Sequence, residues 1–170
     1  SLMPSPLAAP LTRPLGTRPP ARATLRAPFP TVAHAVEAVG GRLVVHIRNH
    51  NAPNAGETLQ TESSDRGKTW SVPHSIGVWG LPSHLLRLDD DRLLMSYGHR
   101  RRPFGNQARL SDDGGSTWSE PLVISGDGAG GDLGYPSTVQ VDDHLVTVWY
   151  ERLKGSPRAV LRQARWKLKG

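Results

Sequence analysis

The 170-residue sequence contains no cysteine, which excludes both a disulfide framework and a thiolate metal site. It also contains no run of 18 apolar residues, so no segment is expected to span a membrane. No N-terminal segment joins a charged start to an apolar core, and no signal peptide is recognised. Because the chain begins at Ser1, a processed leader stays an open alternative, and the compartment is left unassigned.

Glycine and proline are abundant, with 18 and 15 residues, which favours an all-β chain with many turns over a helical one. Eight of the fifteen prolines fall within residues 1–30. Proline has no amide donor and a fixed φ, so this stretch is expected to be an extended or disordered arm. Residues 23–28, with the sequence ATLRAP, are the one part of it that could add an edge strand.

The formal net charge of +6 comes mostly from arginine and favours an anionic partner, either nucleic acid or an acidic glycan. No Lys/Arg stripe and no known nucleic-acid module is present, so nucleic acid is not the expected partner. A guanidinium binds a carboxylate through two parallel hydrogen bonds. We therefore expect an acidic glycan.

An eleven-residue stretch occurs twice, with the two copies 48 residues apart. The matched residues are Ser63, Asp65, Gly67, Thr69, Trp70, Ser71 and Pro73, which recur as Ser111, Asp113, Gly115, Thr117, Trp118, Ser119 and Pro121. A repeat period between about 20 and 50 residues indicates a solenoid, a propeller or an array.

A second repeat surrounds this stretch. Three segments that align on Leu43, Leu93 and Leu145 each predict a strand, a tight turn and a second strand. Third strands are predicted at residues 57–63, 106–111 and 159–166, and fourth strands at residues 72–76 and 122–125. These are three units of about 50 residues, at residues 31–76, 80–125 and 134–168, each the size of a four-stranded propeller blade, with the fourth strand of the last one missing.

The pattern S-x-D-x-G-x-T-W is an Asp-box, and residues 31–166 resemble the sialidases and other Asp-box β-propellers. The resemblance implies an exo-α-sialidase-type glycoside hydrolase with a six-bladed propeller. Because only about three blades are present, we expect the chain to be part of a longer propeller, one half of a homodimeric six-bladed ring, or an atypical fold. The alternative function is a non-catalytic glycan-binding or self-assembling module. No cofactor and no metal is expected.

Strand parity separates two ends of the blades. Successive turns of an antiparallel meander alternate between the ends, which places both Asp-boxes at one end and residues 48–56, 98–105 and 125–137 at the other. We interpret the Asp-box residues as structural. Their Asp can accept hydrogen bonds from turn amides, their Gly allows an otherwise strained φ, and their Trp packs between sheets. The site is therefore expected at the opposite end.

In sialidases three arginines grip the sugar carboxylate and a tyrosine is the nucleophile, an exception among glycosidases. The resemblance assigns Arg48 to the second arginine and one residue of the Arg100–Arg102 run, Arg101 or Arg102, to the third. It assigns Tyr135 to the nucleophile. The second unit has Leu81 at the equivalent position, so the tyrosine is not a packing requirement of every blade. His84, Asn49 and His99 are candidates to line the cavity.

The carboxylates of a sialidase site are poorly represented. The chain has no Asp before Asp65, so the acid/base Asp has no counterpart, and the Glu expected near Val32 is absent. Glu151 is the best remaining partner for Tyr135, with Asp127 and Asp132 as alternatives. A tyrosine with an ordinary pKa near 10 is a poor nucleophile without a base, so we expect little turnover.

Overall fold

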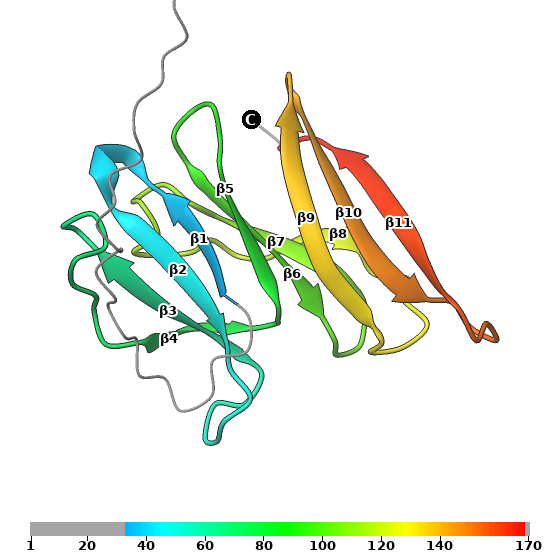
Figure 1. Cartoon of the computed structure of the whole chain (residues 1–170). Helices are drawn as coiled ribbons and strands as arrows, with labels where there is room; N and C mark the ends of the chain where they lie inside the picture. Colours follow the sequence, from blue (N-terminus) through cyan, green and yellow to red (C-terminus); the bar gives the residue numbers. More distant parts are fainter. Residues whose placement is uncertain (1–32, 169–170) are drawn as a thin grey trace, which may run out of the picture.

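A computed structural model describes residues 33–168 of the chain. They form eleven strands and one short 3-10 turn in three antiparallel sheets (Figure 1). The first sheet contains β1 (Ala33–Glu37), β2 (Leu43–Arg48), β3 (Glu57–Ser63) and β4 (His74–Trp79), with η1 (Val39–Gly41) between β1 and β2. The second contains β5 (Ser83–Arg87), β6 (Leu93–His99), β7 (Gly105–Ser111) and β8 (Leu122–Ser125). The third contains β9 (Leu133–Val141), β10 (His144–Arg152) and β11 (Ala159–Trp166).

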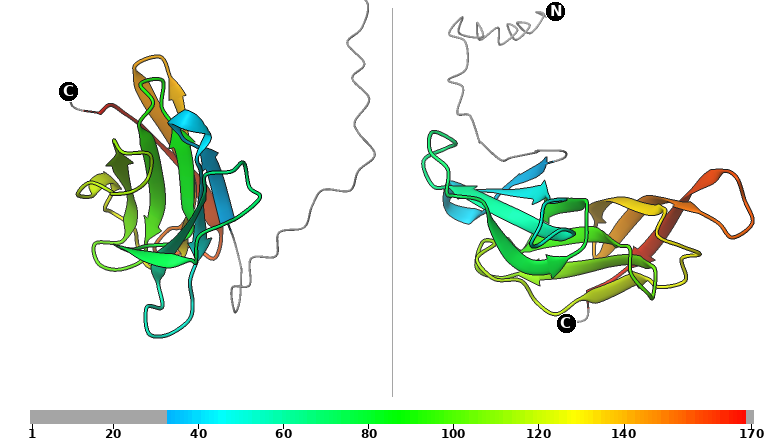
Figure 2. Two further views of the ribbon diagram at one scale, coloured as in Figure 1. Left: turned by 90° about the vertical axis from the view of Figure 1, so that its left-hand side faces the viewer. Right: turned by 90° about the horizontal axis from the view of Figure 1, so that it is seen from below.

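Each sheet is a meander whose first strand lies on the same side of the molecule. β5 contacts β1 on one side and β9 on the other, and a view from below shows the three sheets next to one another in chain order (Figure 2). This arrangement confirms the predicted all-β fold of propeller blades. The predicted arm over residues 1–30 and its edge strand at 23–28 lie outside the described residues.

One strand is displaced from its predicted place. The fourth strand of the first sheet runs over His74–Trp79 instead of residues 72–76. The Ser71 amide still bonds the Glu62 carbonyl as part of the Asp-box, and Pro73 has no amide to give to a ladder. Val72 is 84% exposed between them, so the strand begins only after the proline.

The strand β6 packs against a neighbouring sheet on each of its two faces. For this reason all residues from Leu93 to Gly98 are buried, without the usual alternation of buried and exposed positions. Leu93, Met95 and Tyr97 pack with Val44 of β2 in a core between the first and second sheets. Leu94 points the other way and packs with Leu145 of β10 between the second and third sheets. Alternation along one strand therefore supplies two cores and holds three sheets together.

The two Asp-boxes fold into the same hydrogen-bonded turn. In the first, Asp65 Oδ1 accepts the amides of Lys68 and Thr69 at 2.9 and 2.8 Å, and Oδ2 accepts the Thr69 hydroxyl at 2.6 Å. The Ser63 hydroxyl donates to Asp65 and accepts the Gly67 amide. These bonds, led by that of the Thr69 hydroxyl, hold the pKa of Asp65 well below its usual range.

In the second Asp-box, Asp113 accepts both the amide and the hydroxyl of Thr117 and the hydroxyl of Ser111. Desolvation alone would raise the pKa of Asp113, but these hydrogen bonds lower it to about 2. Gly115 has φ +88° and lies against Val44 of the first sheet, so a side chain there would be both strained and crowded.

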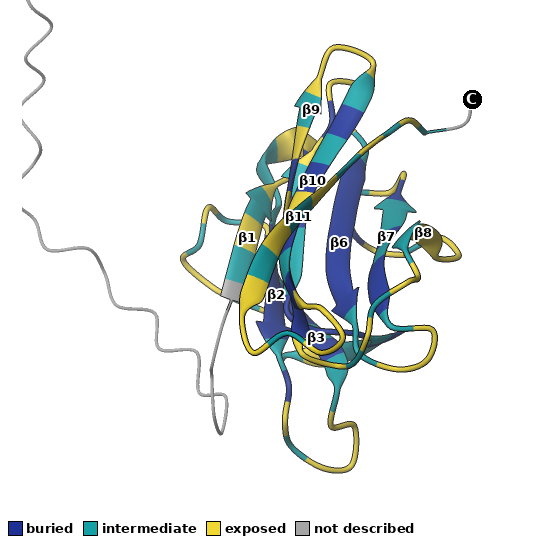
Figure 3. Cartoon of the chain, turned by 90° about the vertical axis from the view of Figure 1, so that its right-hand side faces the viewer, coloured by how far each residue is buried: buried dark blue, intermediate teal, exposed yellow. Residues whose placement is uncertain are grey.

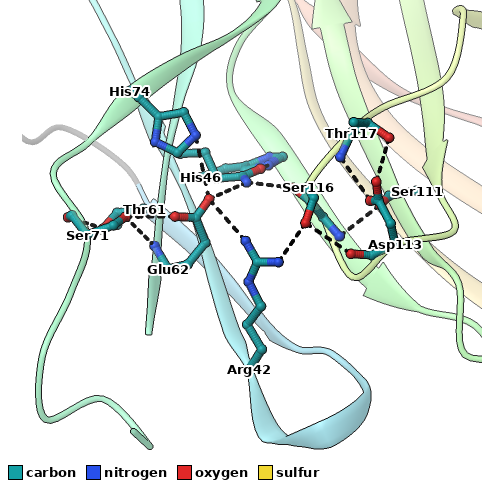
Figure 4. A network of polar contacts seen from close by, with 12 residues as sticks. Arg42, His46, Thr61, Glu62, Ser71, His74, Ser111, Asp113, Ser116 and Thr117 are labelled. Carbon is teal, nitrogen blue, oxygen red and sulfur yellow. Dashed lines mark hydrogen bonds and ion pairs between the residues drawn. The ribbon is translucent and has the colours of Figure 1, made fainter. Parts of the chain in front are cut away.

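Polar contacts join the second Asp-box to the first sheet (Figure 4). Nη1 of Arg42 donates to the Ser116 hydroxyl at 2.7 Å, and Nη2 lies 3.6 Å from Oε1 of Glu62. The amide nitrogen of Gln60 donates to the Gly115 carbonyl at 2.7 Å and to Glu62 at 2.6 Å. The Asp-box thus fixes the position of one blade against the next, at the end away from the candidate site.

His46 on β2 is buried at this interface, with only 1% of its surface exposed. Its Nε2 donates to Gln60 Oε1 at 2.9 Å, its Nδ1 accepts from the Ser83 hydroxyl at 3.0 Å, and its ring packs edge-on against Trp118. Burial lowers the pKa of His46 from 6.5 to about 4, although the Gln60 bond opposes the shift. The folded state therefore holds a neutral imidazole.

This buried imidazole predicts a pH dependence of stability. Between pH 6.5 and about 4 the unfolded chain takes up a proton at this position that the folded chain does not. The free energy of unfolding should therefore fall as the pH is lowered, with His46 contributing up to about 1.4 kcal/mol per pH unit. His84, whose pKa is also lowered to about 4 by burial and by His34, adds to the slope.

Urea denaturation at several pH values checks this. In His46→Asn the slope of the unfolding free energy against pH, between pH 6.5 and about 4, should correspond to about one proton fewer taken up on unfolding. This holds whatever the substitution does to the overall stability. An unchanged slope would show that this imidazole is not held neutral by the fold.

Candidate functional site

Tyr135 lies at the end of the third sheet opposite to the Asp-boxes, at a β-bulge in β9. The register pairs Ser137 with Val148 and Gly134 with Tyr150, so Tyr135 and Pro136 together oppose one residue of β10. Tyr135 has φ +52°, a conformation that is uncommon for any residue but glycine, and its side chain is 48% exposed. Bulges redirect a side chain, and strained residues of this kind concentrate at functional sites.

Arg48, at the end of β2, reaches across to this tyrosine from the first sheet. Its Nη1 donates a 2.8 Å hydrogen bond to the Tyr135 hydroxyl. Its Nε is buried and has no hydrogen-bond partner among the described residues. The structure thus brings together two of the predicted site residues that are 87 positions apart in the chain.

Arg100 approaches Tyr135 from the second sheet. Its guanidinium carbon lies 6.0 Å from the centre of the Tyr135 ring, the same distance as that of Arg48. A Cβ on Gly134 would be only 3.3 Å from Nη2 of Arg100, so the missing side chain leaves room for the guanidinium. Nε of Arg100 is also buried without a partner in the described part of the chain.

Tyr150 of β10 completes the surroundings of Tyr135. The two rings are 5.8 Å apart between centres, and the Tyr150 hydroxyl donates to Oδ1 of Asp132 at 3.0 Å. Burial and the acceptor Asp132 raise the pKa of Tyr150, so it stays a neutral phenol. Oδ2 of Asp132 lies 3.6 Å from Arg152, so this carboxylate is already engaged on both oxygens.

The arginine run is placed differently from the prediction. The guanidinium of Arg101 stacks on the Trp79 ring at 3.7 Å, and that of Arg102 lies 5.7 Å from the Phe104 ring. Both side chains are exposed, whereas Arg100 directly follows β6 and is half-buried. Of the three adjacent arginines, the structure thus places Arg100 beside Tyr135, and it places the predicted Arg101 and Arg102 elsewhere.

Glu151 is not brought to Tyr135. It follows Tyr150 in β10, so its side chain leaves the sheet on the opposite face, where it is 1% exposed. Its Oε2 accepts from Nη1 of Arg162 at 3.0 Å and from the indole nitrogen of Trp149 at 3.1 Å. These contacts pair the buried Glu151 with the partly exposed Arg162, and the structure does not bring it to Tyr135 as predicted.

The alternative carboxylates are also occupied. Asp127 accepts from both terminal nitrogens of Arg162, at 3.1 and 2.9 Å. Asp132 is held by Tyr150 and Arg152, as described above. Within residues 33–168 the only hydrogen bond of the Tyr135 hydroxyl is the one from Arg48.

Of the three residues predicted to line the cavity, Asn49 and His99 have contacts within their own loops, whereas His84 contacts the neighbouring sheets. The side chain of Asn49 bonds the Asn54 carbonyl and the Asn51 amide, and it is buried under the loop that it closes. His99 contacts the Pro103 carbonyl at 3.0 Å. The ring of His84 lies 4.3 Å from that of His34 between the inner strands.

The sequence contained only a partial signal for Arg100. Arg48 and Arg100 each lie an odd number of positions after the aligned leucines, Leu43 and Leu93, whereas Arg101 has the opposite parity. Arg102 has the same parity as Arg100, so alternation alone does not choose between these two residues. The bulge at Tyr135 and the contact with Tyr150 had no comparable signal, because they depend on the register of β9 and β10.

No helix within residues 33–168 is long and apolar enough to cross a membrane. The same residues contain no group of three or more His, Asp and Glu side chains arranged to hold a metal ion.

Blades of antiparallel strands, paired Asp-boxes and an Arg–Tyr cluster at the opposite end define an Asp-box β-propeller. A family model described as a BNR repeat-like domain matches residues 28–148. The chain belongs to this family.

Individual relatives agree with this placement. A sialidase of Micromonospora viridifaciens is 29% identical over 87 residues, which are 51% of this chain and 13% of that protein. A solved protein of unknown function from Dyadobacter fermentans is 30% identical with a TM-score of 0.72, over 81% of this chain and 38% of the other. The α-L-arabinanase of Penicillium chrysogenum, at 15% identity and a TM-score of 0.67, matches 82% of this chain and 46% of its own and shows the fold alone. This chain therefore spans less than half of the length of each of these relatives.

Proposed function

We propose that the chain carries the carboxylate-binding part of a sialidase-type site, which takes an acidic sugar at the end of the blades where Tyr135 lies. Arg48 and Arg100 bind the sugar carboxylate, and Tyr135 is the nucleophile of the corresponding glycoside hydrolase. The partial similarity to a sialidase supports the class of substrate.

The observation that carries the proposal is that Arg48 and Arg100 both lie against Tyr135, a residue with a positive φ. Both guanidinium groups have a buried Nε–H with no protein partner within residues 33–168. An unpaired buried donor is costly, and a carboxylate accepts two parallel bonds from each guanidinium. An anionic sugar would therefore satisfy donors that the fold leaves open.

Titration with N-acetylneuraminic acid, followed by the amide shifts of Gly98 and Gly134, tests this function. Arg48→Lys keeps the charge but loses the planar fork, so the dissociation constant should rise by at least about tenfold. Arg66→Lys, at the exposed Asp-box turn of the other end, is the matched control and should change nothing. Equal affinity of the wild type and Arg48→Lys would exclude Arg48 as a ligand.

A second candidate function is sugar binding without hydrolysis. The placement of the carboxylates favours this function. Glu151, Asp127 and Asp132, the candidates for activating Tyr135, are all engaged by other side chains. A fluorogenic sialoside separates the two functions. Release that Tyr135→Phe abolishes supports the hydrolase, whereas binding with no release above background supports the binding module.

A homodimer that completes a six-bladed ring is part of the proposal. Within residues 33–168 no further sheet follows the third one (Figure 3), and its strands expose Val139, Val148 and Leu161, the last of them 84% exposed. Exposed apolar patches of this kind mark interaction surfaces. A solution mass of about twice 18.5 kDa is expected, and a monomer would contradict the ring.

A further inference from the structure

A cleft of about 530 Å³ lies beside the Arg–Tyr cluster, at the same end of the third sheet. One wall is residues 129–132, just before β9, and the other is residues 152–157, which comprise the end of β10 and most of the loop before β11. Neither segment contains a residue of the Arg48–Arg100–Tyr135 cluster. The first wall is rich in glycine, and a Cβ on Gly130 would have no atom within 4 Å, so the cleft is open along this wall.

The charge of the cleft is positive. Arg152 and Lys154 line it together with one carboxylate, Asp132. That carboxylate is engaged by the Tyr150 hydroxyl at 3.0 Å and by Arg152 at 3.6 Å. Lys154 is exposed and has no ion-pair partner within residues 33–168. The ammonium group is therefore available to an anion.

The wall of the cleft touches the proposed sugar site directly. Asp132 bonds Tyr150, whose ring contacts Tyr135. A Cβ on Gly131 would lie 3.7 Å from the carbonyl oxygen of Arg100. One layer of residues thus separates the cleft from the arginines that face Tyr135.

We propose that this cleft is a second subsite, which binds a carboxylated or sulfated sugar residue next to the acidic sugar held at Tyr135. Lys154 and Arg152 recognise the negative charge of that second residue. The subsite rests on the proposed function, because it takes the neighbouring residue of the same glycan. The preferred ligand is accordingly a glycan with adjacent acidic residues.

Amide NMR titrations with N-acetylneuraminic acid and with its α2,8-linked dimer test the subsite. The Gly130 and Gly155 signals report on the cleft, and the Gly98 and Gly134 signals report on the Tyr135 site. We expect the monosaccharide to shift only the second pair and the dimer to shift both. Loss of one charged contact in Lys154→Ala should weaken the dimer by about tenfold and leave the monosaccharide unchanged. Lys68→Ala, in the Asp-box turn, is the control.

The outcomes separate the two proposals. The subsite would be overturned if the dimer left the amide signals of Gly130 and Gly155 unmoved. It would also be overturned if Lys154→Ala weakened the binding of the monosaccharide and of the dimer equally. A third outcome is that the ligand shifts the amide signals of Gly130 and Gly155, that Lys154→Ala removes these shifts, and that the signals of Gly98 and Gly134 do not move. This outcome would support the cleft as an acidic-sugar site and reject the function proposed at Tyr135.

Discussion

Arg100→Ala is expected to weaken binding of N-acetylneuraminic acid by about 10- to 100-fold. The guanidinium of Arg100 faces the Tyr135 ring at 6.0 Å, and its Nε has no hydrogen-bond partner within residues 33–168. Hydrogen bonds to a charged partner contribute about 1.5–3 kcal/mol, which corresponds to that loss of affinity. Titration calorimetry or the amide shift of Gly134 would measure the change.

Arg102→Ala is the matched control, because it removes the same charge two residues further on. Arg102 is exposed and lies against Phe104, away from Tyr135. Removal of this side chain should leave the affinity for N-acetylneuraminic acid within about twofold of the wild-type value, since solvent and salt largely screen an exposed charge. A larger loss in Arg102→Ala than in Arg100→Ala would restore the assignment made from the sequence.

Gly105→Ala is expected to destabilise the fold by about 3 kcal/mol or more. Gly105 begins β7, and a Cβ there would lie 1.9 Å from the carbonyl oxygen of Ser125 and 2.5 Å from its carbon. Because the clash is with backbone, β8 would have to move away from β7, and overpacking of this kind costs up to about 3 kcal/mol even against side chains. Thermal unfolding should report a melting temperature lower by roughly 10 °C.

Gly130→Ala provides the comparison for this substitution. Its Cβ would meet no atom within 4 Å and its φ is not positive, so the folded state is undisturbed. The stability should be unchanged or higher by about 0.4–1 kcal/mol, because alanine restricts the unfolded chain. Equal melting temperatures for the two variants would show that β8 is not held against Gly105.

The blades were predictable because their signals are local. The Ser, Asp and Thr side chains of each Asp-box bond within their own turn, and the aligned leucines mark one strand in each sheet. The run Leu93–Gly98 predicts a strand, and the two cores that it joins follow from alternation. Tyr135 and Arg48 were predicted as site residues from the family resemblance. In the structure Nη1 of Arg48 lies 2.8 Å from the Tyr135 hydroxyl.

The remaining features of the site depend on contacts between distant segments. The face of Glu151 could be decided only by pairing β10 with β9, and its partner Arg162 is supplied by β11. The choice among three adjacent arginines depends on where β6 ends, because the residues after it no longer alternate as a strand. The subsite cleft joins two loops that no repeat relates to each other.

The central claim is that Arg48 and Arg100 recognise a carboxylate next to Tyr135. The most direct measurement compares the affinity of the wild-type chain for N-acetylneuraminic acid with that for its methyl ester, which keeps the sugar and removes the charge. The account predicts that the acid binds at least about tenfold more tightly. Equal affinities for the acid and the ester would contradict it.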